Sequence, residues 1–231
     1  MKILKTMKLF FSDNIFRREI KYTISLHLSP KEISHLSETD FFKSTIKTHL
    51  IFLILYVVIN FTLSLFNLTY LIEYSEIMRG LLAEGKVSLL MYVLNSFPYN
   101  LFAFGFLLIL FELYFSIGSY LTLKIFGESG VSFLKCLSIV ISSNLYILLS
   151  LFPVLFLFSV MPDGAKRDIF YMILFVGFVS VFVIAGIVLQ MLSFIRVSKT
   201  IFNQNSGRGF LTWFFPVFVI FLFFYWSIRP I

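Results

Sequence analysis

Long apolar runs alternate with short polar segments along most of the chain. A helix rises about 1.5 Å per residue, so about 20 apolar residues are needed to cross a hydrocarbon layer roughly 30 Å thick. Five runs are long enough, and we predict an all-α fold, a polytopic bundle of five transmembrane helices. The predicted spans cover about 49–71, 99–125, 131–160, 169–195 and 210–228.

A sixth apolar run, at 87–97, has only eleven residues and is followed by Pro98. It is too short to span a bilayer, and proline interrupts a helix. We therefore predict a short interfacial or re-entrant helix here. It comes after an acidic connection at 72–85 that follows the first span.

The N-terminal segment has a different pattern. Within its first 16 residues, Lys2, Lys5 and Lys8 share one face of a helix and apolar residues share the other. Such a basic amphipathic helix can lie on an anionic membrane surface. The alternative is that it packs on a soluble part of the same protein. We predict that residues 1–45 form a cytoplasmic or interfacial segment and that residues 46–231 form the transmembrane domain.

A helix start is expected just before the first span. Ser37 and Asp40 have the spacing at which a serine caps the first turn of a helix. We predict a short helix that begins there and leads into the membrane.

Basic residues are distributed unevenly among the predicted loops. The N-terminal segment, the loop between spans two and three and the loop between spans four and five hold nine, two and three Lys or Arg residues, fourteen of the nineteen in the chain. Short loops rich in Lys and Arg face the cytoplasm. We therefore predict a cytoplasmic N-terminus and a C-terminus on the opposite side of the membrane.

Composition supports a membrane protein. The 231 residues are 59% hydrophobic and 13% charged and include 32 phenylalanines, which leaves too little polar surface for a water-soluble domain. The formal net charge of +7 fits the loop asymmetry, and the basic N-terminus lacks the features of a nucleic-acid module. The lipid bilayer is therefore the predicted partner, and nucleic acid is not.

One residue stands out inside the apolar runs. Glu112 is their only formally charged side chain and lies near the middle of the second predicted span. A carboxylate at that depth costs at least a few kcal/mol unless it is protonated or partnered. Ser116 and Ser119 share its helical face, and such a face normally turns toward other helices.

Polar residues of other spans are candidates to meet Glu112. Asn60 lies at a similar depth and is its best-matched partner, while Asn144 and Gln190 lie nearer the cytoplasmic side. We call these residues the polar seam: Glu112, Asn60, Ser116, Ser119, Asn144 and Gln190. Two interpretations stay open. Either Glu112 is a protonatable carboxyl on a transport or proton pathway, or it is a neutral, hydrogen-bonded residue that fixes helix packing, which we favour.

Motifs of hydrolytic and redox enzymes are not found in the sequence. It lacks H-E-x-x-H, G-x-S-x-G, a Gly-rich phosphate loop and paired intramembrane aspartates. Cys136 is the single cysteine and the three histidines are scattered. We therefore predict no enzymatic activity, no catalytic residues, no metal site and no cofactor.

The loop between the second and third predicted spans carries a family resemblance. It runs Tyr120-Leu121-Thr122-Leu123-Lys124-Ile125-Phe126-Gly127 and then Gly130-Val131-Ser132-Phe133-Leu134-Lys135. With five spans, a mid-helix Pro153 and a basic turn from Arg196 to Arg208, this pattern resembles the Yip1-like integral membrane proteins in their bacterial form. The acidic-Leu-Tyr-Gly-Pro motif of the eukaryotic members is absent, so binding of a Rab-type GTPase is not implied.

The resemblance implies a non-enzymatic protein of the bacterial inner (cytoplasmic) membrane, of a family associated in eukaryotes with vesicle trafficking. We expect a role in membrane organisation or helix association, with other membrane proteins or further copies of the chain as partners. The alternative is a small transporter or permease subunit that uses the polar seam around Glu112.

Overall fold

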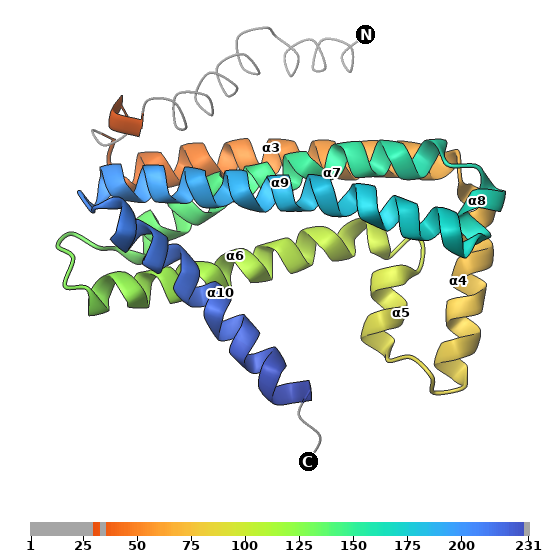
Figure 1. The fold of residues 1–231 in the computed structure, drawn as a ribbon. Coiled ribbons are helices and arrows are strands. Elements are labelled where there is room, and N and C mark those ends of the chain that lie inside the picture. The colour runs from red at the N-terminus through yellow and green to blue at the C-terminus, as the bar shows by residue number, and fades with distance from the viewer. Residues whose placement is uncertain (1–29, 33–35, 229–231) are drawn as a thin grey trace, which may run out of the picture. The chain divides into compact units, whose positions relative to one another are not determined.

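The fold was analysed in a computed structural model, which describes residues 30–32 and 36–228. All regular secondary structure in this part of the chain is helical, and five of its helices are long and apolar enough to cross a membrane (Figure 1). They are α3 (Glu38–Leu65), α6 (Asn100–Ile125), α7 (Phe133–Val160), α9 (Ile169–Ile201) and α10 (Ser206–Ile228). The predicted all-α, five-span fold is confirmed, and the chain is a multi-pass membrane protein.

Shorter helices connect the spans. A single 3-10 turn, η1 (Pro30–Glu32), precedes α3, and α8 (Asp163–Arg167) joins α7 to α9. Between α3 and α6 the chain forms α4 (Leu68–Ala83) and α5 (Leu89–Asn95), which lie side by side (Figure 1). The apolar run at 87–97 thus contains a seven-residue helix, α5, capped by a bond from Met91 N–H to Ser88 Oγ at 3.2 Å.

The first span differs from its predicted bounds of 49–71. Its helix, α3, begins at Glu38, because Ser37 Oγ accepts a hydrogen bond from the Asp40 backbone N–H at 3.2 Å, as the spacing of these residues predicted. It ends at Leu65, and most of the acidic connection at 72–85 is helical, within α4. A polar sequence does not end a helix when its residues remain good helix formers.

The later spans also extend past the apolar runs. The fourth helix, α9, continues beyond residue 195 to Ile201, and Asn203 then adopts a positive φ of 51°. Asparagine tolerates this left-handed conformation, which stops the helix. The predicted basic amphipathic helix with Lys2, Lys5 and Lys8 lies outside the described residues.

The chain folds as two compact units. Unit 1 takes in the described residues up to His49, Phe115–Ser143 and the residues from Met191 onward. Unit 2 takes in Leu50–Tyr114 and Asn144–Gln190. Four of the long helices contribute residues to both units, and α10 belongs to unit 1 alone.

Aromatic rings and a glycine contact organise unit 1. Phe115 packs against Phe194 and Trp213, with ring centroids 5.8 and 6.4 Å apart. A Cβ added at Gly118 would lie 2.7 Å from Cγ of Pro216, so only glycine lets α10 come this close to α6. These contacts fix α6, α9 and α10 together within the unit.

An ion pair and a hydrogen bond hold the loop that carries the family resemblance, which also lies in unit 1. Gly127 and Gly130 have positive φ angles of 70° and 69°, so glycine suits both turns. Glu128 in this loop pairs with Arg208 at 3.0 Å. At the start of α7, Ser132 donates a hydrogen bond to Glu38 at 2.7 Å.

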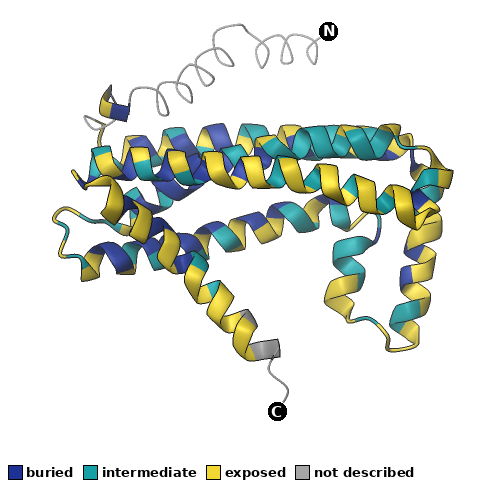
Figure 2. Ribbon diagram, viewed as in Figure 1, coloured by how far each residue is buried: buried dark blue, intermediate teal, exposed yellow. Residues whose placement is uncertain are grey.

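In unit 2 the core is built on Tyr56, Leu108 and Leu148, which come from α3, α6 and α7. The helices α7 and α9 run through both units, and 44% of an 18-residue apolar stretch of α7 is buried, against 6% for α9. Figure 2 shows the same contrast, since α9 is mainly exposed while much of α7 is buried. Lipid is the solvent that such an apolar, exposed helix requires.

Candidate functional site

Three polar side chains of unit 2 form a buried polar cluster. Asn144 Nδ2 donates to Glu112 Oε1 at 3.4 Å, and Gln190 Nε2 donates to Asn144 Oδ1 at 3.2 Å. The three residues are 3%, 0% and 2% exposed for Glu112, Asn144 and Gln190. The cluster therefore links α6, α7 and α9 by side-chain hydrogen bonds where water does not reach.

Close helix packing brings the cluster together. Gly186 lies one helical turn before Gln190, and a Cβ at this position would be 2.5 Å from Ser150 Oγ and 3.3 Å from the Tyr146 carbonyl oxygen. The absence of a side chain at Gly186 thus allows α9 to approach α7. On α6, Leu108 lies one turn before Glu112 and is part of the unit 2 core, so Glu112 projects inward.

The chemistry of the cluster suits packing better than proton transfer. Asn144 and Gln190 are amides, which donate and accept hydrogen bonds but do not take up protons near neutral pH. Their two bonds run in one direction, from Gln190 to Asn144 to Glu112. This chain of bonds holds a buried carboxyl in place and cannot by itself relay a proton.

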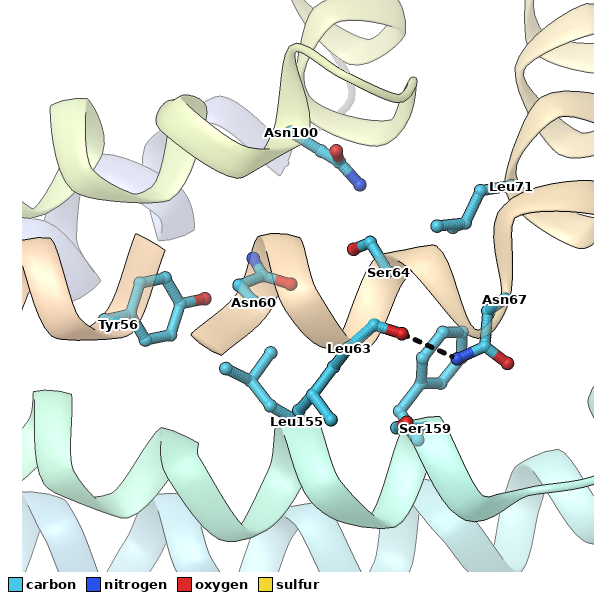
Figure 3. Close-up of a pocket in the computed structure, with 10 residues that line it drawn as sticks. Tyr56, Asn60, Leu63, Ser64, Asn67, Leu71, Asn100, Leu155 and Ser159 are labelled. Atoms are coloured by element: carbon cyan, nitrogen blue, oxygen red, sulfur yellow. Dashed lines mark hydrogen bonds between the residues drawn. The ribbon is translucent and has the colours of Figure 1, made fainter. Parts of the chain in front are cut away.

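The prediction that Asn60 is the partner of Glu112 is wrong. Asn144 bonds to Glu112, whereas Asn60 lines a separate cavity in the same unit. Similar depth along two helices does not determine which faces meet, because that depends on how each helix is rotated. Asn60 faces the helix ends near Asn67 and Asn100 instead (Figure 3).

The remaining residues of the polar seam belong to unit 1. Ser116 and Ser119 are fully buried there, and they are not part of the unit that holds Glu112. The expected inward orientation of this face of α6 is confirmed by the burial of Glu112, Ser116 and Ser119. Among the predicted residues of unit 2, Asn60 lies apart from the other three, in a separate cavity.

We call the space around Asn60 the polar cavity. It has a volume of about 230 Å³, is partly enclosed, and is lined from α3, the α3–α4 junction, α4, α6 and α7 (Figure 3). Its walls mix amide, hydroxyl, aromatic and aliphatic side chains. The lining residues are Tyr56, Asn60, Leu63, Ser64, Asn67, Leu71, Asn100, Leu155, Phe158 and Ser159.

Most polar side chains of this cavity have no hydrogen-bond partner among the described residues. This holds for Tyr56, Asn60, Ser64, Asn100 and Ser159, and the Asn100 Oδ1 atom is itself buried. Asn67 is the exception, since its Nδ2 donates to the Leu63 carbonyl oxygen at 3.3 Å and its Oδ1 accepts from Lys166. Buried polar groups are normally hydrogen-bonded, so the Asn100 Oδ1 atom, which has no partner among the described residues, is unusual.

A buried lysine adjoins the cavity at Asn67. Lys166 of α8 is 4% exposed, bonds to Asn67 and forms an ion pair with Asp163 at 3.0 Å. Its ammonium group also lies 5.4 and 5.3 Å from the ring centroids of Tyr70 and Phe158, within range of a cation–π attraction. Burial raises the pKa of the Tyr70 phenol; nearby Tyr74 adds to the rise and Arg167 opposes it.

Sequence reasoning missed this cavity. Part of the signal was present, because Tyr56, Asn60, Ser64 and Asn67 fall at offsets of 0, 4, 8 and 11 and share one helical face. Asn100, Ser159 and Lys166 come from distant segments, and no local pattern connects them to that face. Lys166 in particular has the sequence context of a solvated loop residue.

Within the described residues, no group of three His, Cys, Asp or Glu side chains is arranged to hold a metal ion. Comparisons of the chain with protein-family models, curated proteins and solved structures give no match.

Proposed function

We propose that this protein is a non-enzymatic, Yip1-like integral membrane protein of the bacterial inner membrane, which acts through helix association and membrane organisation. The buried polar cluster carries the proposal, because Asn144 donates to Glu112 and Gln190 donates to Asn144, which joins three helices. Polar contacts of this kind hold helices together in lipid, where helix association gains little from the hydrophobic effect.

The exposed faces of the spans support a role in association. Along α9, Phe170, Ile173, Phe178, Val181 and Ile184 are each at least 60% exposed. Lipid or the helices of another membrane protein can cover this apolar surface. We propose that other membrane proteins, or further copies of this chain, are the partners in the membrane, with the N-terminus on the cytoplasmic side.

The proposal is tested by self-association in lipid vesicles. Copies labelled at their termini with donor or acceptor dyes should show energy transfer that persists as the protein-to-lipid ratio falls, and cross-linking in native membranes should capture the chain with membrane proteins. Energy transfer that falls to the level of random collisions, together with no cross-linked membrane protein, would overturn the proposal.

A second candidate is a small transporter or permease subunit. The observation that favours it is the presence, in one unit, of a buried carboxyl at Glu112 and a polar cavity at Asn60. Vesicles loaded with a pH-sensitive dye distinguish the two functions. The transporter predicts that Glu112→Gln removes a flux that the unaltered protein supports, whereas the association role predicts equal permeability for both proteins.

A further inference from the structure

The polar cavity of unit 2 has the composition of a binding site for a small neutral ligand. Five of its side chains have hydrogen-bonding groups that the described protein does not use: Tyr56, Asn60, Ser64, Asn100 and Ser159. The Asn100 Oδ1 atom is buried, and leaving it unpaired costs roughly 1–3 kcal/mol. A molecule that both donates and accepts hydrogen bonds would satisfy these groups.

The charge of the cavity limits the class of ligand. No ionised side chain is among its lining residues. Lys166 adjoins the cavity at Asn67, but it is already engaged by the Asp163 carboxylate and by the Asn67 amide oxygen. A charged group placed inside would therefore lose hydration without gaining an opposite charge, which disfavours ionic ligands.

The size and walls of the cavity narrow the class further. Each water occupies about 30 Å³ in the liquid, so 230 Å³ corresponds to roughly seven or eight waters. That is room for a triol and close to the limit for a hexose. Aliphatic and aromatic walls from Leu63, Leu155 and Phe158 fit the carbon side of such a molecule, while the hydroxyls and amides fit its oxygens.

The cavity is lined by residues at the ends of three spanning helices. Ser64 is in the last turn of α3, Asn100 is the first residue of α6, and Ser159 is next to the last residue of α7. These helix ends belong to one side of the membrane by the topology of the chain. We infer that the polar cavity binds a glycerol-like polyol group, supplied either by a free polyol or by the glycerol headgroup of a phospholipid.

This inference is independent of the association role, because a binding site of this kind serves either candidate function. The test uses the full chain in lipid nanodiscs. In phosphatidylcholine nanodiscs, added glycerol should give a saturation-transfer NMR signal from the protein. In a second arm without free glycerol, native mass spectrometry should show whether phosphatidylglycerol is retained in preference to phosphatidylethanolamine with the same acyl chains.

Substitutions of lining residues test whether the ligand binds in the polar cavity. The double substitution Asn60→Leu with Ser64→Ala should weaken binding about tenfold or more, and Ser159→Ala should weaken it severalfold, since each lost hydrogen bond is worth up to about tenfold in affinity. The matched control is Asn95→Leu on α5, whose amide bonds only to the Met91 carbonyl oxygen of its own helix, at 2.8 Å. It should leave binding unchanged.

The two arms distinguish the sources of the ligand. Binding in the first arm alone identifies a free polyol, and selective retention in the second identifies a lipid headgroup. No binding in either arm, or equal binding by the unaltered protein and the double variant, would overturn the inference. Ser159→Ala removes a single oxygen, so the test stands even if the double variant does not fold.

Discussion

In the buried polar cluster Glu112, Asn144 and Gln190 bond to one another, whereas in the polar cavity Asn60 and Asn100 face a shared space without bonding to the described protein. Both sets lie in unit 2 among apolar residues. Both sets contain amide side chains. The two sets differ in whether their polar groups are hydrogen-bonded within the protein. Side chains that bond to one another stabilise the fold, whereas side chains without such bonds are available to a ligand.

The cavity also contains an internal contrast. Asn67 lines the same space as Asn60, but its amide bonds to the Leu63 carbonyl oxygen and to Lys166. Two asparagines of one site should therefore respond differently to the same substitution. Whether the amide is hydrogen-bonded, and not its residue type or location, should determine how much the substitution lowers the free energy of unfolding.

The largest effect is expected for Asn144→Leu. This change removes the donor to Glu112 and the acceptor for Gln190 together, and unsatisfied buried groups cost about 1–3 kcal/mol. We expect the free energy of unfolding to fall by about 2 kcal/mol in a detergent titration. Replacing all three residues by leucine should recover part of the loss, because both partners of each of these two bonds are then removed together. A loss below about 0.5 kcal/mol for Asn144→Leu would show that the cluster does not stabilise the fold.

An intermediate effect is expected for Lys166→Met. Methionine keeps the apolar stem but removes the bond to Asn67 and the pair with Asp163, so the free energy of unfolding should fall by about 1 kcal/mol. The matched control is Lys86→Met, which removes an exposed pair with Glu84 at 2.6 Å. Such surface pairs contribute little, and the control should change stability by less than about 0.5 kcal/mol. Equal losses in the two variants would contradict a stabilising role for the buried lysine.

The smallest effect is expected for Asn60→Leu. Its side chain has no partner among the described residues, so the change should leave the free energy of unfolding within about 0.5 kcal/mol or raise it slightly. Asn67→Leu is the matched comparison and should destabilise the protein by about 1 kcal/mol, because it breaks two bonds. Thermal or detergent titration of both variants measures the change in the free energy of unfolding. A larger loss for Asn60→Leu than for Asn67→Leu would contradict the distinction between unpaired and paired asparagines.

The amino-acid sequence determined the features that depend on local pattern. The apolar length of each run predicted five spanning helices, the Ser37–Asp40 spacing predicted the start of α3, and helical periodicity predicted that Glu112, Ser116 and Ser119 face inward. Each of these follows from helix geometry and from the length of chain that crosses a hydrocarbon layer.

The tertiary structure decided which helix faces meet. It paired Glu112 with Asn144 instead of Asn60, brought Asn60, Asn100 and Ser159 around one cavity, and buried Lys166 against Asn67. These contacts join residues from separate helices, and they depend on how each helix is rotated and how closely it packs. Depth in the membrane can be counted along a sequence, but rotation about the helix axis is fixed only when the helices pack together.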